Sequence, residues 1–329
     1  MKSMASIKMT AEKTIPVAGR PALYVAIVLV ALLGTFAYKL RFEGVFACPI
    51  ADKADSFLAD CHATGYADYD HGAFWFDLEP SALRAAHEAN VLFLGSSRLQ
   101  FGLSSPSTAD WFSKSGISFY LLGFSYTENV AFVTPLLDKI RPQASVYVIN
   151  VDRFFSDIET VPATEILKDR DARNRYSEKR FWQRVQEPLC RTLTWFCGNQ
   201  VAFFRERDTG MWYRKGVAPF KPSDIGNGPA TNMDRWPQFE TIAQRFVEQL
   251  PVARECVLLT ILPYDETRRG EAEAIAGSLG LKLLTPDVSG LRTFDGSHLD
   301  PESADRWSAA FFELAGPQIQ RCLAEPRRS

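Results

Sequence analysis

The sequence has little of what metal-binding, nucleotide-binding and nucleic-acid-binding proteins require. It contains four histidines, no Cys-x-x-Cys pair, no Cys/His cluster with zinc spacing and no glycine-rich phosphate loop, so we expect neither a metal nor another cofactor. Neither sign of charge is in excess, with 37 basic against 39 acidic residues, and nothing indicates a nucleic-acid partner. What remains is a chain of 329 residues, long enough to bury a large core.

Six cysteines are present, an even number that permits disulfides in an exported domain. Their connectivity stays open, because six cysteines can pair in many ways. A buried free thiol is the alternative for Cys256, which lies in an apolar strand. Cys48 with Cys61 and Cys190 with Cys197 bracket short segments, and Cys256 and Cys322 remain.

An uncharged apolar run, PALYVAIVLVALLGTFAY, covers residues 21–38. At about 1.5 Å per helical residue it spans the roughly 30 Å of a bilayer's hydrocarbon core, so we expect a single transmembrane anchor. Basic residues dominate residues 1–20, which favours a cytoplasmic N-terminus, an inner-membrane location and a periplasmic C-terminal domain. A cleaved signal peptide is the alternative, although no small-x-small cleavage site follows the run directly.

Short apolar strands alternate with helical segments from residue 91 onward. We expect strands at VLFLG, ISFYLLG, SVYVINV, CVLLTILPY and LKLL, with helices between them and a closing helix over residues 301–322. Continuously apolar strands that alternate with helices are typical of a parallel sheet covered on both faces. The predicted fold class is therefore α/β. Residues 39–90 precede it as a juxtamembrane segment, irregular over residues 41–78.

Residues 154–235 interrupt this alternation and are rich in Arg, Lys, Trp and Phe. Connections between strands and helices usually take a few residues, so a long one indicates a lid or a substrate-binding insertion. A helical subdomain with its own small aromatic core is the alternative.

Two polar segments carry the residue types of a nucleophilic site. Ser97 follows the first strand, and Asp295 and His298 lie in an Asp-Gly-Ser-His loop before the last helix. A serine hydroxyl becomes a good nucleophile when a histidine takes its proton and a carboxylate orients that histidine. Either motif alone is common in ordinary turns, but a parallel sheet brings strand ends together at one edge. Arg98, next to the serine, pairs either with a substrate anion or with a neighbouring carboxylate.

These residues resemble the SGNH/GDSL hydrolase superfamily. Gly95-Ser96-Ser97 matches the family's first block, with Ser97 as nucleophile, and Asp295 and His298 match its last block. The resemblance covers residues 91–323 without the insertion, and it implies a three-layer, flavodoxin-like fold. It also implies an oxyanion hole, for which Gly123 and Asn150 are the candidate donors. The chain departs from the family at two positions, Tyr126 and Asp152, and whether Asn150 or Asp152 takes the third-block position stays open.

The resemblance extends to accessory proteins of polysaccharide O-acetylation and of teichoic acid D-alanylation, which also act beside the membrane. It implies an O-acyltransferase or acyl esterase for a cell-surface polysaccharide, with an acylated or acyl-accepting glycan and a multipass membrane O-acyltransferase as partners. A non-catalytic SGNH-like scaffold that binds a glycan or such an acyltransferase is the alternative. A structural envelope protein with coincidental motifs is the third hypothesis.

Overall fold

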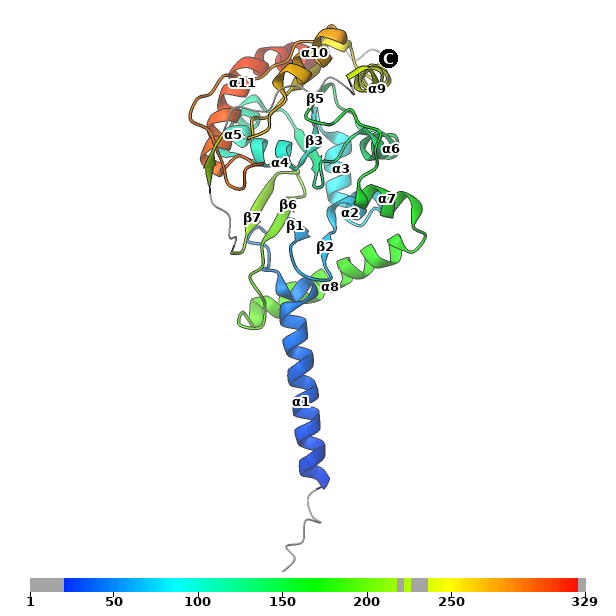
Figure 1. Cartoon of the computed structure of the whole chain (residues 1–329), viewed down its shortest axis with the longest axis vertical. Coiled ribbons are helices and arrows are strands. Elements are labelled where there is room, and N and C mark those ends of the chain that lie inside the picture. Colours follow the sequence, from blue (N-terminus) through cyan, green and yellow to red (C-terminus); the bar gives the residue numbers. More distant parts are fainter. Residues whose placement is uncertain (1–20, 218–221, 226–235, 325–329) are drawn as a thin grey trace, which may run out of the picture. The chain divides into compact units, whose positions relative to one another are not determined.

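The computed structural model describes residues 21–217, 222–225 and 236–324 (Figure 1). The predicted cytoplasmic segment 1–20 lies outside them, as do residues 218–221 and 226–235 of the predicted insertion. The chain divides into two units, Met1–Leu40 and Arg41–Ser329. The elements in chain order are α1 (Pro21–Phe42), η1 (Gly44–Ala47), β1 (Ser56–Cys61), β2 (Ala67–Asp68), α2 (Asp70–Trp75), α3 (Pro80–Glu88), β3 (Val91–Ser96), α4 (Ser97–Leu103), α5 (Pro106–Ser115), β4 (Phe119–Phe124), α6 (Val130–Ile140), β5 (Val146–Asn150), α7 (Val161–Lys168), α8 (Ala172–Thr192), β6 (Ala202–Glu206), β7 (Trp212–Lys215), β8 (Ser223–Asp224), α9 (Trp236–Gln249), η3 (Arg254–Cys256), β9 (Val257–Thr260), α10 (Arg269–Ser278), β10 (Arg292–Thr293) and α11 (Pro301–Ala324).

The apolar run that predicted a membrane anchor forms the helix α1. The prediction of a transmembrane helix is wrong, because no helix among the described residues combines the length and the apolarity that a membrane crossing requires. α1 continues beyond the uncharged run through the charged residues Lys39 and Arg41. The predicted single-pass location in the inner membrane, with a periplasmic domain, is overturned by the same finding.

A four-stranded parallel sheet lies at the centre of the second unit. Its strand order is β4-β3-β5-β9, and each neighbouring pair is parallel. The chain passes from β3 to β4 on one side and then crosses to β5 on the other, so the strand order reverses at β3. The predicted fifth strand, LKLL, is reduced to a single bridge between Leu283 and Leu259. The fold class is therefore mixed α/β with a parallel sheet and, among the described residues, no membrane-spanning helix.

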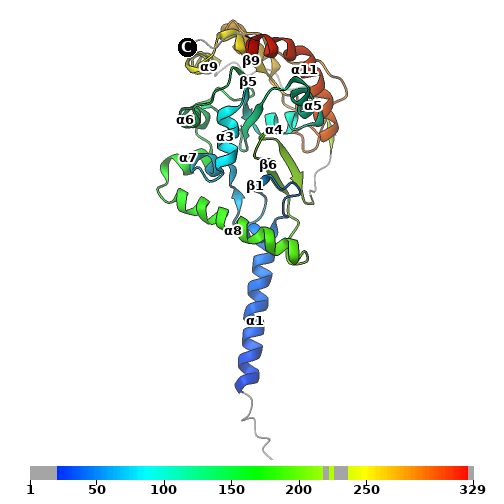
Figure 2. The ribbon, with the colours of Figure 1, turned by 180° about the vertical axis from the view of Figure 1, so that it is seen from behind.

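Helices cover both faces of this sheet (Figure 1, Figure 2). α4, α5 and α11 lie on one face, and α3 and α6 lie on the other. Alternate strand residues such as Phe93, Leu121 and Val148 pack into one core with Trp307 and Phe311 of α11. Because both faces are covered, the strands are apolar at every position.

Local signals fix the ends of α5, which frames this core. The Ser105 side chain accepts a hydrogen bond from the Thr108 N–H, and Pro106 occupies the first turn. The helix ends at Gly116, whose φ of 64° lies in the left-handed region that glycine adopts readily. The sequence Ser-Pro at one end and Gly at the other therefore sets the length of this helix.

A second sheet joins two segments that are far apart in the sequence. Its strand order is β2-β1-β6-β7, and all its pairs are antiparallel. β1 and β2 come from residues 41–78, so the prediction of an irregular segment there is wrong. β6 and β7 come from the predicted insertion, which also contains α7 and α8. The described part of the insertion is thus neither a simple lid nor a purely helical subdomain, because its strands pair with the N-terminal segment.

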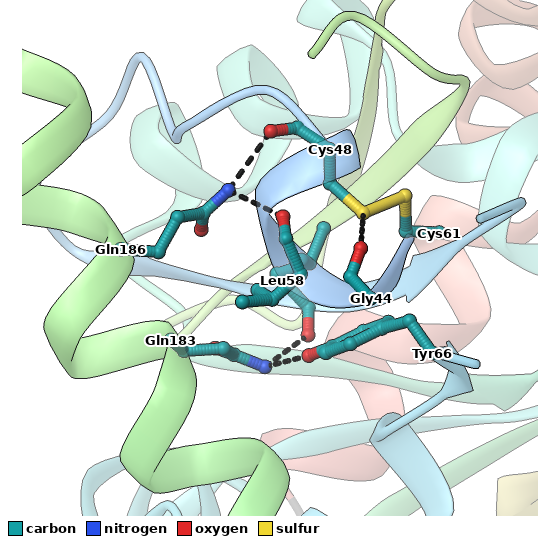
Figure 3. Close-up of a disulfide and its surroundings, with 8 residues drawn as sticks. Gly44, Cys48, Leu58, Cys61, Tyr66, Gln183 and Gln186 are labelled. Atoms are coloured by element: carbon teal, nitrogen blue, oxygen red, sulfur yellow. Dashed lines mark hydrogen bonds between the residues drawn. A yellow bond between two sulfur atoms is a disulfide. The ribbon is translucent and has the colours of Figure 1, made fainter. Parts of the chain in front are cut away.

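The long helix α8 is fixed to the chain around β1 (Figure 3). Its Gln186 donates a hydrogen bond to the carbonyl oxygen of Cys48 at 2.8 Å, and its Gln183 donates one to the carbonyl oxygen of Leu58 at 2.9 Å. A disulfide joins Cys48 to Cys61 at the end of β1. These contacts hold the helix at two points against the second sheet.

All six cysteines form disulfides, so the alternative of a buried free thiol at Cys256 is wrong. The Cys256 bond ties the end of η3, just before β9, to the last turns of α11. The pairs are Cys48–Cys61, Cys190–Cys197 and Cys256–Cys322.

Candidate active site

Ser97 is the first residue of α4 and follows β3 directly. The preceding residue, Ser96, ends the strand and caps the helix, because its Oγ accepts a hydrogen bond from the Arg98 N–H at 3.4 Å. This sharp passage from strand to helix puts Ser97 at the carboxyl edge of the parallel sheet. Ligands bind at that edge in open α/β sheets, at the point where the strand order reverses.

A hydrogen-bonded chain joins the three side chains that the sequence singles out. Ser97 Oγ lies 2.9 Å from Nε2 of His298. Nδ1 of the same ring lies 2.8 Å from Oδ2 of Asp295. The structure therefore brings a hydroxyl, an imidazole and a carboxylate together in that order, although Ser97 and His298 are 201 positions apart.

The loop that carries Asp295 and His298 holds its own carboxylate in place. Oδ1 of Asp295 accepts hydrogen bonds from the backbone N–H groups of Ser297 and His298 at 3.0 and 2.9 Å. Gly296 has a φ of 82°, a left-handed conformation that favours glycine. Asp295 thus supplies the acid, Gly296 the turn and His298 the imidazole. Ser297, between them, accepts a hydrogen bond from Arg98.

The charge on Asp295 is stabilised in this position. Partial burial opposes its ionisation, but the hydrogen bond and the charge of His298 and the two backbone N–H groups outweigh burial and hold its pKa below the usual value. Asp295 is therefore ionised near neutral pH. An ionised carboxylate keeps the proton of the neutral imidazole on Nδ1, which leaves Nε2 free to accept the serine proton.

Two aromatic rings fix the plane of the His298 ring. Phe294 stacks on it with centroids 5.5 Å apart and an interplanar angle of 17°. Phe101, from α4, meets it edge-to-face at 4.9 Å. The stacked Phe294 ring covers one face of the imidazole, and the two aromatic rings together restrict its rotation.

Arg98 connects three loops at this edge of the sheet. Its guanidinium forms an ion pair with Asp152, in the loop after β5, and its Nε donates a hydrogen bond to Ser297 Oγ at 3.1 Å. The guanidinium carbon also lies 3.9 Å above the ring of Tyr264, whose hydroxyl donates to Asp152 at 3.2 Å. Of the two partners expected for Arg98, the structure contains the neighbouring carboxylate.

Burial is the main reason that the pKa of Tyr264 rises to about 12, and the charge of Asp152 raises it further. The phenol therefore stays protonated and remains a hydrogen-bond donor to Asp152. Arg98 thus supplies the counter-charge of the Asp152 carboxylate, and Tyr264 supplies a hydrogen bond to it.

Gly123 lies inside β4, directly opposite Gly95 of β3, rather than in the loop beyond the strand. A Cβ at this position would approach the carbonyl oxygen of Ser96 to 2.8 Å, so a larger residue does not fit beneath the start of α4. The Gly123 carbonyl oxygen accepts a hydrogen bond from Gln100 at 2.8 Å. In the turn that follows, Tyr126 has a φ of 60°, a glycine-like conformation at the position where the resemblance to SGNH/GDSL hydrolases implies a glycine.

Asn150 is the last residue of β5 and is fully buried. Its Oδ1 accepts a hydrogen bond from the Leu262 N–H at 3.2 Å, whereas its Nδ2 has no hydrogen-bond partner among the described residues. Its Cβ lies 3.0 Å from the position that a Cβ on Gly95 would take. Asn150 therefore sits beside the end of β3 with an unused donor.

Sequence reasoning missed the roles of Ser297 and Tyr264 in holding Arg98. The signal for Ser297 was present in its place inside the Asp-Gly-Ser-His loop. For Tyr264 the only signal was its place at the end of an apolar strand, where side chains from neighbouring strands meet.

No group of three or more His, Cys, Asp or Glu side chains in the described ranges is placed to bind a metal ion. Comparison with protein-family models, with curated proteins and with solved structures finds no match to this chain.

Proposed function

We propose that this chain is an SGNH-like serine acyltransferase or acyl esterase. The hydrogen-bonded chain from Ser97 through His298 to Asp295 carries the proposal. This arrangement activates a hydroxyl for attack on an acyl carbonyl, and it recurs on unrelated folds that carry out this chemistry.

The proposed reaction proceeds in two halves. As Ser97 Oγ bonds to the acyl carbonyl carbon, His298 Nε2 takes the serine proton. Collapse of the tetrahedral intermediate breaks the ester bond, and the leaving alkoxide takes that proton from His298, which leaves an acyl group on Ser97. A second hydroxyl, from water or from an acceptor sugar, then repeats the steps in reverse and releases the acyl group. Asp295 holds the imidazole and stabilises its positive charge in both halves.

We assign the stabilisation of the oxyanion to the Ser97 backbone N–H and the Asn150 side chain, with Gly123 as the third donor that the resemblance implies. The unused Nδ2 of Asn150 supports this assignment. Asp152 is the weaker candidate because its carboxylate is already bound to Arg98 and Tyr264. A donor missing from such a site typically lowers turnover by about 10²–10³.

The resemblance supports O-acyl esters of a cell-surface polysaccharide as substrates. Labelling with a fluorophosphonate tests the nucleophile directly, since that reagent reacts with activated serines. The parent protein should be labelled, whereas Ser97→Ala and His298→Ala should not. Ser96→Ala is the matched control, because Ser96 is the adjacent serine but caps α4 instead of contacting His298. Equal labelling of Ser97→Ala and the parent would remove the catalytic proposal.

A non-catalytic SGNH-like domain that binds a glycan is the second candidate. The full burial of Asn150 favours it, since a donor beneath the surface needs a local movement to reach an oxyanion. Binding of an acetylated polysaccharide by both the parent and Ser97→Ala, without turnover or labelling of either, would establish this function in place of the first.

A further inference from the structure

Three arginines line a small cavity beside α8. The cavity has a volume of about 90 Å³ and lies between α8, β1 and β6. Arg180 and Arg184 come from one face of α8, one turn apart, and Arg207 comes from the chain after β6. No residue of the candidate active site lines it.

The two acidic residues of the cavity wall are already bound to other side chains. Glu79 accepts hydrogen bonds from Arg207 Nε at 2.9 Å and from the Tyr69 hydroxyl at 3.1 Å, one on each carboxylate oxygen. Glu187 forms an ion pair with Arg191 at 2.8 Å. Each of these carboxylates therefore already has another side chain as its hydrogen-bond or ion-pair partner.

Arg180 and Arg184 are left with unused donors. Nε of Arg180 is shielded from solvent and has no hydrogen-bond partner among the described residues. Arg180 forms an ion pair with Glu79 across 4.0 Å, a distance too long for a hydrogen bond. No described residue forms a hydrogen bond or an ion pair with Arg184. The cavity wall thus carries three arginines against two carboxylates, and donors on Arg180 and Arg184 are left over.

We propose that this cavity binds a tetrahedral oxyanion, namely a phosphate or sulfate group. The planar guanidinium group binds the oxygens of such an anion through two parallel hydrogen bonds. Arg207 adds positive charge from the chain after β6, but its Nε and Nη1 already donate to Glu79 and to the Ser56 carbonyl oxygen. The unused donors for an anion therefore come from Arg180 and Arg184.

The cavity is held in shape before any ligand arrives. Gln183 and Gln186 fix α8 to the chain around β1, as Figure 3 shows, so the arginines need little rearrangement to bind. The Arg180 side chain is 26% exposed, which leaves the cavity open to solvent. The anion is therefore either a free ion or a phosphate group carried on a larger molecule such as a sugar.

Calorimetric titration of the full chain tests this proposal. Inorganic phosphate and glucose 1-phosphate should each be titrated at constant ionic strength set with sodium chloride. We expect saturable binding of phosphate with one ion per chain, weakened at least tenfold in Arg180→Gln and in Arg184→Gln. Arg173→Gln is the matched control, because Arg173 is exposed on the same helix and does not line the cavity, and it should bind as the parent does.

The sugar phosphate distinguishes the two sources of the anion. Comparable binding of both compounds supports a phosphate carried on a larger molecule, whereas binding of inorganic phosphate alone supports a free ion. No saturable binding of phosphate or sulfate, unchanged binding in Arg184→Gln, or equally tight binding of acetate would overturn the proposal. Phosphate should also raise the Tm of the parent but not of the variants. Arg184→Gln carries the test if Arg180→Gln fails to fold, because Arg184 is exposed.

Discussion

Arg98 and Asp152 form an ion pair next to the proposed nucleophile, with the Asp152 side chain 1% exposed. The pair links the residue after Ser97 to the loop after β5, and Arg98 extends the link to Ser297 in the loop of the proposed catalytic histidine. The same guanidinium thus fixes the relative positions of the segments that carry the proposed nucleophile and base. We infer that Arg98 is a positioning residue rather than a substrate-binding one.

Replacing Asp152 by alanine should lower the free energy of unfolding by about 3 kcal/mol, because a largely buried guanidinium then loses its counter-charge. Urea denaturation measures the change. Glu273→Ala is the control, since Glu273 is 56% exposed and pairs with Arg269 at the surface of α10, and its effect should stay below about 1 kcal/mol. Equal effects of the two substitutions would contradict the structural role of the Arg98–Asp152 pair.

Asp295→Asn should lower the turnover of p-nitrophenyl acetate by about 10³–10⁴ with little change in stability. The amide can favour the wrong tautomer of His298, and it cannot stabilise the imidazolium that forms during the reaction. Steady-state kinetics and a thermal melt together separate the two effects. Asp110→Asn, at an exposed position of α5, should behave as the parent does. Unchanged turnover in Asp295→Asn would show that the carboxylate has no part in the reaction.

Asp60 should make the protein less stable as the pH rises from about 4 to 7. Burial, followed by the charge of Asp68, raises the pKa of Asp60 from 3.8 to about 7. Between these values the folded state holds a proton that the unfolded state has released, so the free energy of unfolding falls with pH by at most about 4 kcal/mol.

The variant Asp60→Asn keeps the shape of the protonated side chain and removes the titration. Its stability relative to the parent should therefore increase between pH 4.5 and 7.5 in urea denaturation. The exposed Asp138→Asn should show a constant difference from the parent over this range. A constant difference for Asp60→Asn as well would mean that Asp60 titrates alike in the folded and unfolded states.

Removing the Cys256–Cys322 disulfide should cost more stability than removing Cys190–Cys197. The first closes a separation of 66 positions and the second one of 7. Loop-closure entropy in the unfolded chain predicts losses of about 4 and about 2.5 kcal/mol for the paired alanine variants. Guanidinium denaturation under non-reducing conditions measures both, and a larger loss at Cys190–Cys197 would contradict this ranking.

The sequence predicted the parts of the fold that local patterns determine. Apolar runs such as VLFLG and SVYVINV form the parallel strands β3 and β5, because strands covered on both faces must be apolar throughout. The proximity of Ser97 and His298 was predicted from topology and not from local sequence, because the carboxyl ends of parallel strands lie at one edge of the sheet.

Other features depend on contacts that no local pattern records. β1 reads as an irregular segment because its pairing partner, β6, lies in a distant part of the chain. The sequence also could not distinguish between the two expected partners of Arg98, because a guanidinium binds a protein carboxylate and a substrate anion with the same geometry. The membrane prediction rested on the length and apolarity of residues 21–38, and no helix of the described residues meets both requirements for a membrane crossing.

The pairing of β1 with β6 has a consequence for biosynthesis. A ribosome completes β1, at Cys61, well before it begins β6, at Ala202, and three of the four strands of the parallel sheet are made in between. During that interval the nascent chain presents an unpaired strand edge, which is a template for wrong association. Chaperone dependence during translation is therefore expected to end only after β6 and its antiparallel partner β7, which ends at Lys215, have emerged from the ribosome.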